Sequence, residues 1–179
     1  MTSMTQWLDR NRAFAEHYQN TFKVLPPSAT IILTCADARV DPAHILGVGL
    51  GEATILRGPG ARVTADVEQD IGILWTLASQ FLGRPAQISL AIIQHTDCGF
   101  ERLAIPEIRS VISQRLAIAE TEVAALAVAD HHATLQADIE RLRQSPQVPK
   151  NLIVTGYLYH VEDGLVREVF PPQTLNKLA

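Results

Sequence analysis

The chain has 179 residues, of which 47% are hydrophobic and 19% charged, and its formal net charge at pH 7 is −4. This composition excludes a disordered or fibrous chain and predicts a single domain over residues 1–179. The small negative charge gives no electrostatic reason to expect nucleic acid or an anionic membrane as a partner.

The start of the chain carries neither the basic residues nor the apolar stretch of a signal peptide. No apolar run approaches the roughly 20 residues that a membrane span requires. In such a setting the two cysteines, Cys35 and Cys98, are more often metal ligands or catalytic groups than disulfide partners. We therefore expect a reduced, cytoplasmic protein.

An amphipathic helix is predicted near the start of the chain, over residues 5–19. Trp7, Asn11, Phe14 and Tyr18 recur at helical spacing. Two prolines at 26–27 end the segment, and we treat residues 1–25 as an N-terminal helical arm. The apolar stripe suits a partner surface, but packing on the core of the same chain explains it equally well.

Apolar runs alternate with helical patterns along the rest of the chain. Asp163 and Gly164 form a turn signal, after which an antiparallel strand is expected. This alternation predicts an α/β fold, in which a mainly parallel sheet has helices on both faces. The predicted strands are 29–34, 53–57, 88–94, 152–159 and 165–170, and the predicted helices are 67–81 and 135–142.

Both cysteines lie in short polar motifs directly after predicted strands. Cys35 follows the run 29–34, and His95 and Cys98 follow the run 88–94. Ligands of parallel sheets bind beyond the carboxyl ends of the strands, so this placement indicates a site. Two thiolates and one imidazole form a zinc ligand set with one open position, as catalytic zinc requires. The alternative is a pair of buried cysteines and a hydrogen-bonded histidine.

Asp37 and Arg39 follow Cys35 closely enough to share its site. Residues two apart in a loop can turn to the same side, so Arg39 is expected to hold Asp37 in a bidentate ion pair. The ionised carboxylate would either accept a hydrogen bond from zinc-bound water or become the fourth zinc ligand. An oriented acceptor matters here, because two thiolates cancel the formal charge of zinc. The ion then lowers the pKa of its bound water less than a zinc held by histidines alone. The alternative is a surface salt bridge.

Four other features are interpreted as lying outside the chemistry. Asp97 is interpreted as a solvated loop residue rather than a partner of the ligands. His131 and His132 are interpreted as a solvated helix face, and His44 is left out of the site because only its ordinary pKa suggests a proton relay. The glycines of 47–51 are interpreted as a connecting turn, since no Lys-Ser/Thr ending follows them.

The motifs at 35–39 (CADAR) and 95–99 (HTDCG) resemble the Cys-x-Asp-Ser/Ala-Arg and His-x-x-Cys-Gly signatures of β-class carbonic anhydrases. The resemblance covers roughly residues 28–170 and includes 51–57 and 156–164. It implies a Zn²⁺ cofactor on Cys35, His95 and Cys98, with Asp37 and Arg39 as the catalytic dyad.

The resemblance also implies a four-stranded parallel sheet extended by an antiparallel strand. It further implies an obligate homodimer that exchanges its N-terminal helices, and pairing of dimers into tetramers is left open. No cofactor other than zinc is expected.

The sequence departs from the family at the segment 57–60 (RGPG), where most members have an asparagine after the arginine. The loss of that amide, the backbone donor that Pro59 lacks, and the absence of a glutamine in 46–50 all favour a more apolar pocket. The compact branch with HTDCG also includes carbonyl sulfide and carbon disulfide hydrolases.

Three functions follow as hypotheses. The leading one is reversible hydration of carbon dioxide to bicarbonate. The second is hydrolysis of carbonyl sulfide to hydrogen sulfide and carbon dioxide, with carbon disulfide ranked behind it. The third is an inactive zinc-binding structural or regulatory protein, which the Asp37–Arg39 pair argues against because a structural site needs no oriented base.

Overall fold

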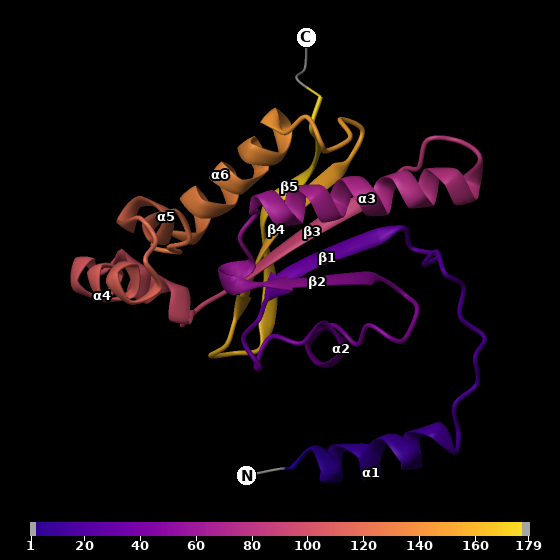
Figure 1. Ribbon diagram of the computed structural model, residues 1–179. Helices are drawn as coiled ribbons and strands as arrows, with labels where there is room; N and C mark the ends of the chain where they lie inside the picture. Colours follow the sequence, from indigo (N-terminus) through magenta and orange to yellow (C-terminus); the bar gives the residue numbers. More distant parts are fainter. Residues whose placement is uncertain (1–2, 177–179) are drawn as a thin grey trace.

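The computed structural model describes residues 3–176 (Figure 1). Five strands form one sheet in the order β2-β1-β3-β4-β5. The first four are mutually parallel, and β5 pairs with β4 in the antiparallel sense. This confirms the predicted α/β fold. The strands are β1 (Thr30–Cys35), β2 (Thr54–Gly58), β3 (Ser89–His95), β4 (Ile153–His160) and β5 (Leu165–Thr174).

Helices and 3₁₀ turns connect the strands. α3 begins after the N-cap Thr64 and ends at Gly83, whose positive φ of 63° is a common way to terminate a helix. α6 begins after the N-cap Asp130, which accepts a hydrogen bond from the Ala133 amide. The elements are α1 (Met4–Ala15), α2 (Pro42–Ile45), α3 (Ala65–Leu82), α4 (Pro106–Leu116), α5 (Glu120–Ala125), α6 (His131–Gln144), η1 (Pro59–Ala61) and η2 (Gly99–Ala104).

The main core lies between the sheet and the helices α3 and α6, which Figure 1 shows together on one side of it. Ile71 of α3 and Leu135 of α6 are fully buried against strand residues such as Leu33 and Ile92. Burial of such side chains stabilises the fold by about 1.5–3 kcal/mol each. The short α2 lies on the other side of the sheet.

The parallel register brings two strand ends together. Thr34 of β1 lies opposite Ile93 of β3, so Cys35 and His95 leave the sheet at the same edge. On its other side, His95 pairs with Tyr159 of β4. The carboxyl edge of the sheet therefore carries both motifs, as the sequence predicted.

The N-terminal helix differs from its prediction. α1 ends at Ala15, so Tyr18 lies beyond it, in a segment whose asparagine and threonine disfavour helix. The rings of Phe14, Tyr18 and Phe22 still pack in series in a tilted arrangement, with centroids 5.4 and 6.1 Å apart. No residue of α1 is buried by the described chain, and Figure 1 shows the helix standing away from the sheet. α1 therefore does not pack on the core of its own chain.

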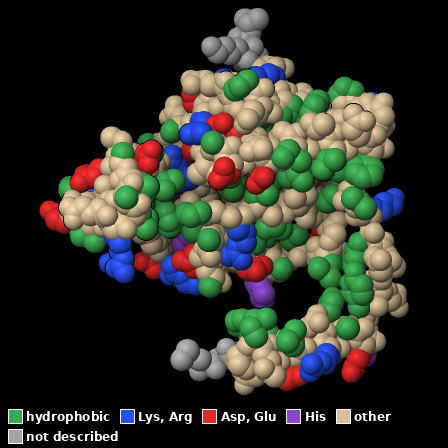
Figure 2. Space-filling model, viewed as in Figure 1, with side chains coloured by type: hydrophobic (Ala, Val, Ile, Leu, Met, Phe, Trp, Pro, Cys, Tyr) green, Lys and Arg blue, Asp and Glu red, His purple; other side chains and the backbone are tan. Residues whose placement is uncertain are grey.

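Hydrophobic side chains lie on the inner side of the arm, across an open space from a part of the body where hydrophobic, charged and histidine side chains are mixed (Figure 2). On another part of the body, Leu77 and Phe81 of α3 are more than half exposed. Among residues 3–176, none of the helices is both long enough and apolar enough to cross a membrane.

The hairpin at the end of the chain follows its prediction, with a longer second strand. Gly164 has a φ of 73°, which suits the tight turn between β4 and β5. β5 continues through Pro171 and Pro172 to Thr174. Prolines are tolerated there because β5 is an edge strand, with one side free of ladder hydrogen bonds.

Candidate metal centre

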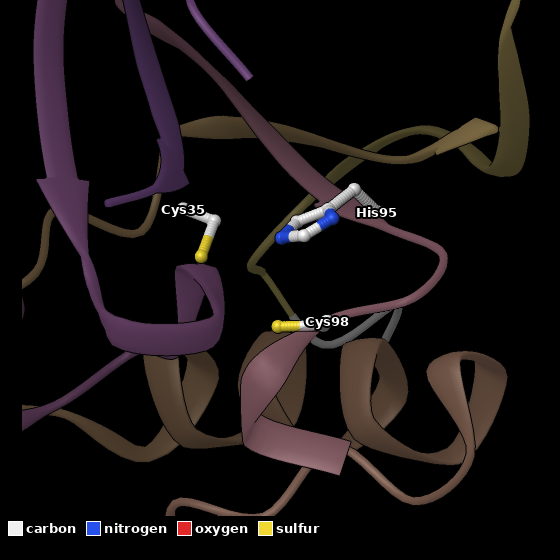
Figure 3. Close-up of side chains that lie close together, drawn as sticks. All are labelled: Cys35, His95 and Cys98. Carbon is white, nitrogen blue, oxygen red and sulfur yellow. The ribbon is translucent and has the colours of Figure 1, made fainter. Parts of the chain in front are cut away.

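Cys35, His95 and Cys98 meet at the carboxyl edge of the sheet (Figure 3). Cys35 ends β1, His95 ends β3, and Cys98 is the N-cap of η2. Their ligand atoms all lie within 4.8 Å of one another, and all three residues are buried. Zinc bonds of about 2.0–2.3 Å to nitrogen and sulfur place tetrahedral ligands at comparable separations, so the donor set fits this ion.

The His95 ring is oriented as a metal ligand would be. Its Nδ1 lies 2.9 Å from the carbonyl oxygen of Thr96, which makes Nδ1 the protonated donor. Its Nε2 is buried and has no hydrogen-bond partner among the described residues. In Figure 3 a ring nitrogen faces the two sulfurs. A buried nitrogen without a partner is costly, and a metal ion would satisfy it.

The contact between the two thiols shifts their pKa values in opposite directions. A hydrogen bond from Cys98 lowers the pKa of Cys35, burial opposes this, and the neighbouring His95 supports it. The same thiol contact raises the pKa of Cys98, and burial adds to that rise. Only a bound cation would stabilise both sulfurs as thiolates, which is the chemistry of a metal site.

Asp37 and Arg39 form the bidentate pair that the sequence predicted. Arg39 Nε donates to Asp37 Oδ1 at 3.0 Å, and Arg39 Nη2 donates to Oδ2 at 2.8 Å. The Arg39 backbone amide adds a hydrogen bond to Oδ1 at 2.8 Å. These contacts hold the pKa of Asp37 well below its ordinary value, with the Arg39 side chain the largest cause. The carboxylate is therefore ionised across the neutral range.

Asp37 lies beside the cluster rather than within it. Its Oδ2 is 3.9 Å from Nε2 of His95, and the compact ligand group does not include it.

Asp97 is an exposed loop residue, as interpreted, but it also holds Arg39. Although its side chain is 72% exposed, its Oδ2 accepts from Arg39 Nη1 at 2.7 Å, and its carbonyl oxygen accepts from Nη2 at 2.9 Å. Asp97 adopts a φ of 54°, a left-handed conformation that aspartate tolerates better than most residues. Arg39 is thus held from both cysteine motifs, a contact across 58 residues that no local signal announces.

Arg57 fixes the loop that carries Cys35 and Asp37, a role that sequence reasoning missed. Its Nε donates to the carbonyl oxygen of Cys35 at 3.1 Å. Its Nη2 donates to the carbonyls of Asp37 at 2.6 Å and Val40 at 3.2 Å. The signal for it was the position of Arg57 within the strand segment that matches the family.

The departure at 58–60 forms the turn η1 beside the cysteines. Gly60 has a φ of 62°, and a Cβ there would come within 2.8 Å of Val128, so glycine is required. Ala61 is buried with the two cysteines, and Phe100 packs against them. This wall of the site is apolar.

Of the two histidines expected on a solvated helix face, His132 is exposed and His131 is not. His131, at the start of α6, has its Nδ1 at 3.0 Å from Oε1 of Gln94 and its Nε2 at 3.5 Å from Oε1 of Glu101. The ring of His132 packs on Phe170 with centroids 4.5 Å apart. The prediction was wrong for His131, because the tertiary placement of α6 against β3 and β4 decides which of its residues are covered.

His44 stays outside the cluster. Its side chain is largely exposed, and its Nδ1 lies 3.6 Å from Asp41. The glycines at 47–51 lie in the loop between α2 and β2, as predicted.

The parallel sheet and the Cys-His-Cys cluster at its carboxyl edge define an α/β protein with a site suited to a metal-dependent enzyme. No protein-family model matches the chain. The crystal structure of carbonic anhydrase from Streptococcus mutans superimposes with a TM-score of 0.76 and 32% sequence identity, covering 94% of this chain and 98% of that one. The chain belongs to the β-carbonic anhydrase family.

Curated relatives carry two different activities in their names. Beta-carbonic anhydrase 1 of Mycobacterium tuberculosis is 28% identical over 174 residues, covering 96% of this chain and all of the relative. Carbon disulfide hydrolase of Saccharolobus solfataricus is 28% identical over 170 residues, covering 82% of this chain and 79% of the relative. The similarity supports a carbonic anhydrase-type enzyme. It does not identify the substrate, for which the residues of the site are the guide.

Proposed function

We propose that this protein is a zinc enzyme that reversibly hydrates carbon dioxide to bicarbonate. The observation that carries the proposal is the Asp37–Arg39 pair beside the buried Cys-His-Cys cluster. A structural zinc site needs no oriented carboxylate, whereas attack of water on carbon dioxide does. Cys35, His95 and Cys98 would hold the zinc.

When bound, zinc supplies Lewis acidity, which lets water act as a nucleophile near neutral pH. Oδ2 of Asp37 already accepts one hydrogen bond from Arg39 and has capacity for a second. Because Arg39 lowers the pKa of Asp37, this carboxylate is a poor store for a proton and a good acceptor of a hydrogen bond. We assign to the Asp37 carboxylate the role of orienting the attacking water. The proton of that water leaves to solvent.

Carbonyl sulfide or carbon disulfide hydrolysis is the second candidate. Its support is the apolar wall of 58–61 with Phe100, together with the relatives named carbon disulfide hydrolase. Sulfur is a weaker hydrogen-bond acceptor than oxygen, so an apolar wall suits a sulfur-containing substrate better than a polar clamp does.

A paired assay on protein of measured zinc content separates the candidates. Stopped-flow hydration of carbon dioxide and sulfide release from carbonyl sulfide and carbon disulfide are measured on the same preparation. We expect one zinc per chain and hydration faster than sulfide release. Faster sulfide release would replace the leading candidate with the second, and zinc without turnover would favour a binding protein. Cys98→Ser, which removes a ligand, is the matched control and should lose zinc and turnover together.

We also propose a homodimer in which the arm of one chain covers the other. The support is the unburied helix α1 with half-exposed Trp7 and Phe14, and the exposed Leu77 and Phe81 on the body. Separate apolar surfaces of this kind on one chain mark an interaction site. The proposal extends to no larger assembly.

A further inference from the structure

A chain of polar side chains connects the two sides of the cysteine-histidine cluster. It starts at Gln94, which directly precedes His95 and is 1% exposed. It passes through His131, whose two ring nitrogens lie 3.0 Å from Gln94 Oε1 and 3.5 Å from Glu101 Oε1. It ends where Glu101 accepts a hydrogen bond from the backbone amide of Cys98 at 2.9 Å.

The hydrogen bonds among Gln94, His131 and Glu101 select one tautomer of His131. Burial lowers the pKa of His131, with Glu101 opposing, which favours the neutral ring. If Nδ1 carried the proton, the lone pair of Nε2 would face the Glu101 carboxylate. The side-chain nitrogen of Gln94 would also stay buried with no partner among the described residues.

The tautomer with the proton on Nε2 gives more polar groups a hydrogen-bond partner. Rotating the Gln94 amide by half a turn about its last bond places its nitrogen on Nδ1 of His131, and the Nε2–H of His131 then donates to Glu101. Only the amide oxygen of Gln94 is then left without a partner, and an unpaired buried carbonyl is better tolerated than an unpaired N–H.

Glu101, the last of these polar side chains, fixes a tight turn. Cys98 is the N-cap of η2, and Glu101 closes a capping box around it. Asp97 just before it has a φ of 54°, so the turn between His95 and Cys98 has little freedom to shift without strain. The Val128 amide, which donates to the carbonyl of Phe100 at 3.2 Å, ties η2 to the segment that leads into α6.

We propose that Gln94, His131 and Glu101 are positioning residues that fix the separation of His95 and Cys98, with His131 held as the Nε2–H tautomer. The inference rests on the proposed zinc site but adds residues that neither signature motif includes. None of the three provides a ligand atom to the cluster. They act through the backbone of Cys98 and the residue before His95.

The tautomer is tested by ¹⁵N NMR of the histidine side chains in the zinc-bound protein, with His131 assigned by its loss in His131→Phe. We expect an unprotonated Nδ1 and a protonated Nε2 for His131. A protonated Nδ1 would overturn the assignment. This measurement does not depend on turnover.

The positioning role is tested by zinc affinity in competition with a chelator. His131→Phe keeps an aromatic ring, though a larger one, and Glu101→Leu keeps a side chain of similar size. Each is expected to weaken zinc binding by about 10–100-fold, the usual effect of losing such a partner. Glu101→Gln keeps the acceptor for the Cys98 amide and should restore most of the affinity. His132→Phe is the matched control and should bind zinc as the parent does, since its ring only packs on Phe170.

Cobalt(II) in place of zinc gives a second readout, because its visible d–d bands report ligand geometry. We expect these bands to change in Glu101→Leu and to return in Glu101→Gln. Parent-like affinity and bands in both Glu101→Leu and a folded His131→Phe would overturn the inference, as would an equal loss in His132→Phe. If His131→Phe does not fold, the Glu101 pair decides.

The test separates this inference from the proposed function. Zinc binding that depends on His131 and Glu101 without hydration of carbon dioxide would refute the function and keep the inference. Hydration of carbon dioxide by a protein whose zinc affinity does not change in the His131 and Glu101 variants would keep the function and refute the inference. A parent protein that binds neither zinc nor cobalt would refute both.

Discussion

The Asp37 carboxylate has two partners to satisfy, Arg39 beside it and the water that it is proposed to orient. Asp37→Asn removes the charge but keeps the size, and Asp37 is not among the compact ligand group. We expect zinc content to stay at the parent level while kcat/KM for hydration at neutral pH falls about 100-fold or more. Zinc analysis and stopped-flow assays on the same sample check this, and full activity in the zinc-loaded variant would contradict it.

The sequence predicted the parts of the site that are close together in the chain, and it brought Cys35 to His95 and Cys98 because both motifs follow predicted parallel strands. Cys35, Asp37 and Arg39 lie within five residues after one strand, so their proximity follows from local geometry. The contacts from Asp97 to Arg39 and from His131 to Gln94 span 58 and 37 residues. They depend on how two loops and a helix pack, which no periodicity encodes.

At the scale of elements, a buried ion pair joins α6 to the turn that follows η1. Arg62 donates to both carboxylate oxygens of Asp138 at 2.9–3.2 Å and to the carbonyls of Ala125 and Ala127. Asp138 is almost fully buried, and burial raises its pKa while Arg62 opposes that rise. The pair therefore anchors α6, the helix that carries His131, to the segment beside the cysteines.

Asp138→Ala leaves the Arg62 guanidinium buried without its carboxylate. We expect the free energy of unfolding to fall by about 3–5 kcal/mol, measured by denaturant titration followed by circular dichroism. Asp163→Ala, which breaks the exposed pair with Arg167, is the control and should change stability little. A loss in Asp138→Ala no larger than in the control would show that the pair does not anchor α6.

The elements themselves were predicted unevenly for a physical reason. β1, β3, α3 and α6 bury apolar residues in continuous runs or at helical spacing, which the sequence pattern reveals. α4 buries none of its residues and α5 only Val123, so neither has a stripe to detect. At α1 the aromatic spacing was correct, but the helix ends before the third aromatic ring.

At the scale of the whole molecule, the exposed arm predicts the state of assembly. We expect a solution mass of twice the 19.6 kDa chain by light scattering at micromolar concentration. The double variant Trp7→Ser with Phe14→Ser should shift the mass toward one chain, because it removes apolar contact area that the described chain leaves uncovered.

Val111→Ser provides the control for that experiment. Val111 is an exposed apolar residue of α4, which Figure 1 shows far from α1. It should leave the mass unchanged. An unchanged mass in the double variant as well would show that the arm does not hold the assembly together.

The order of strands in the sheet has a consequence for the newly made protein. A nascent chain has all three ligand residues by position 98, yet β4, which pairs His95 with Tyr159, is made only with residues 153–160. α6, with His131, is also made after the ligands. The ligand geometry is therefore complete only after β4 has been made, since such long-range pairings form late. Selection among metal ions by geometry acts on a chain that already includes β4, and an ion captured earlier would meet the cysteines in an unordered segment.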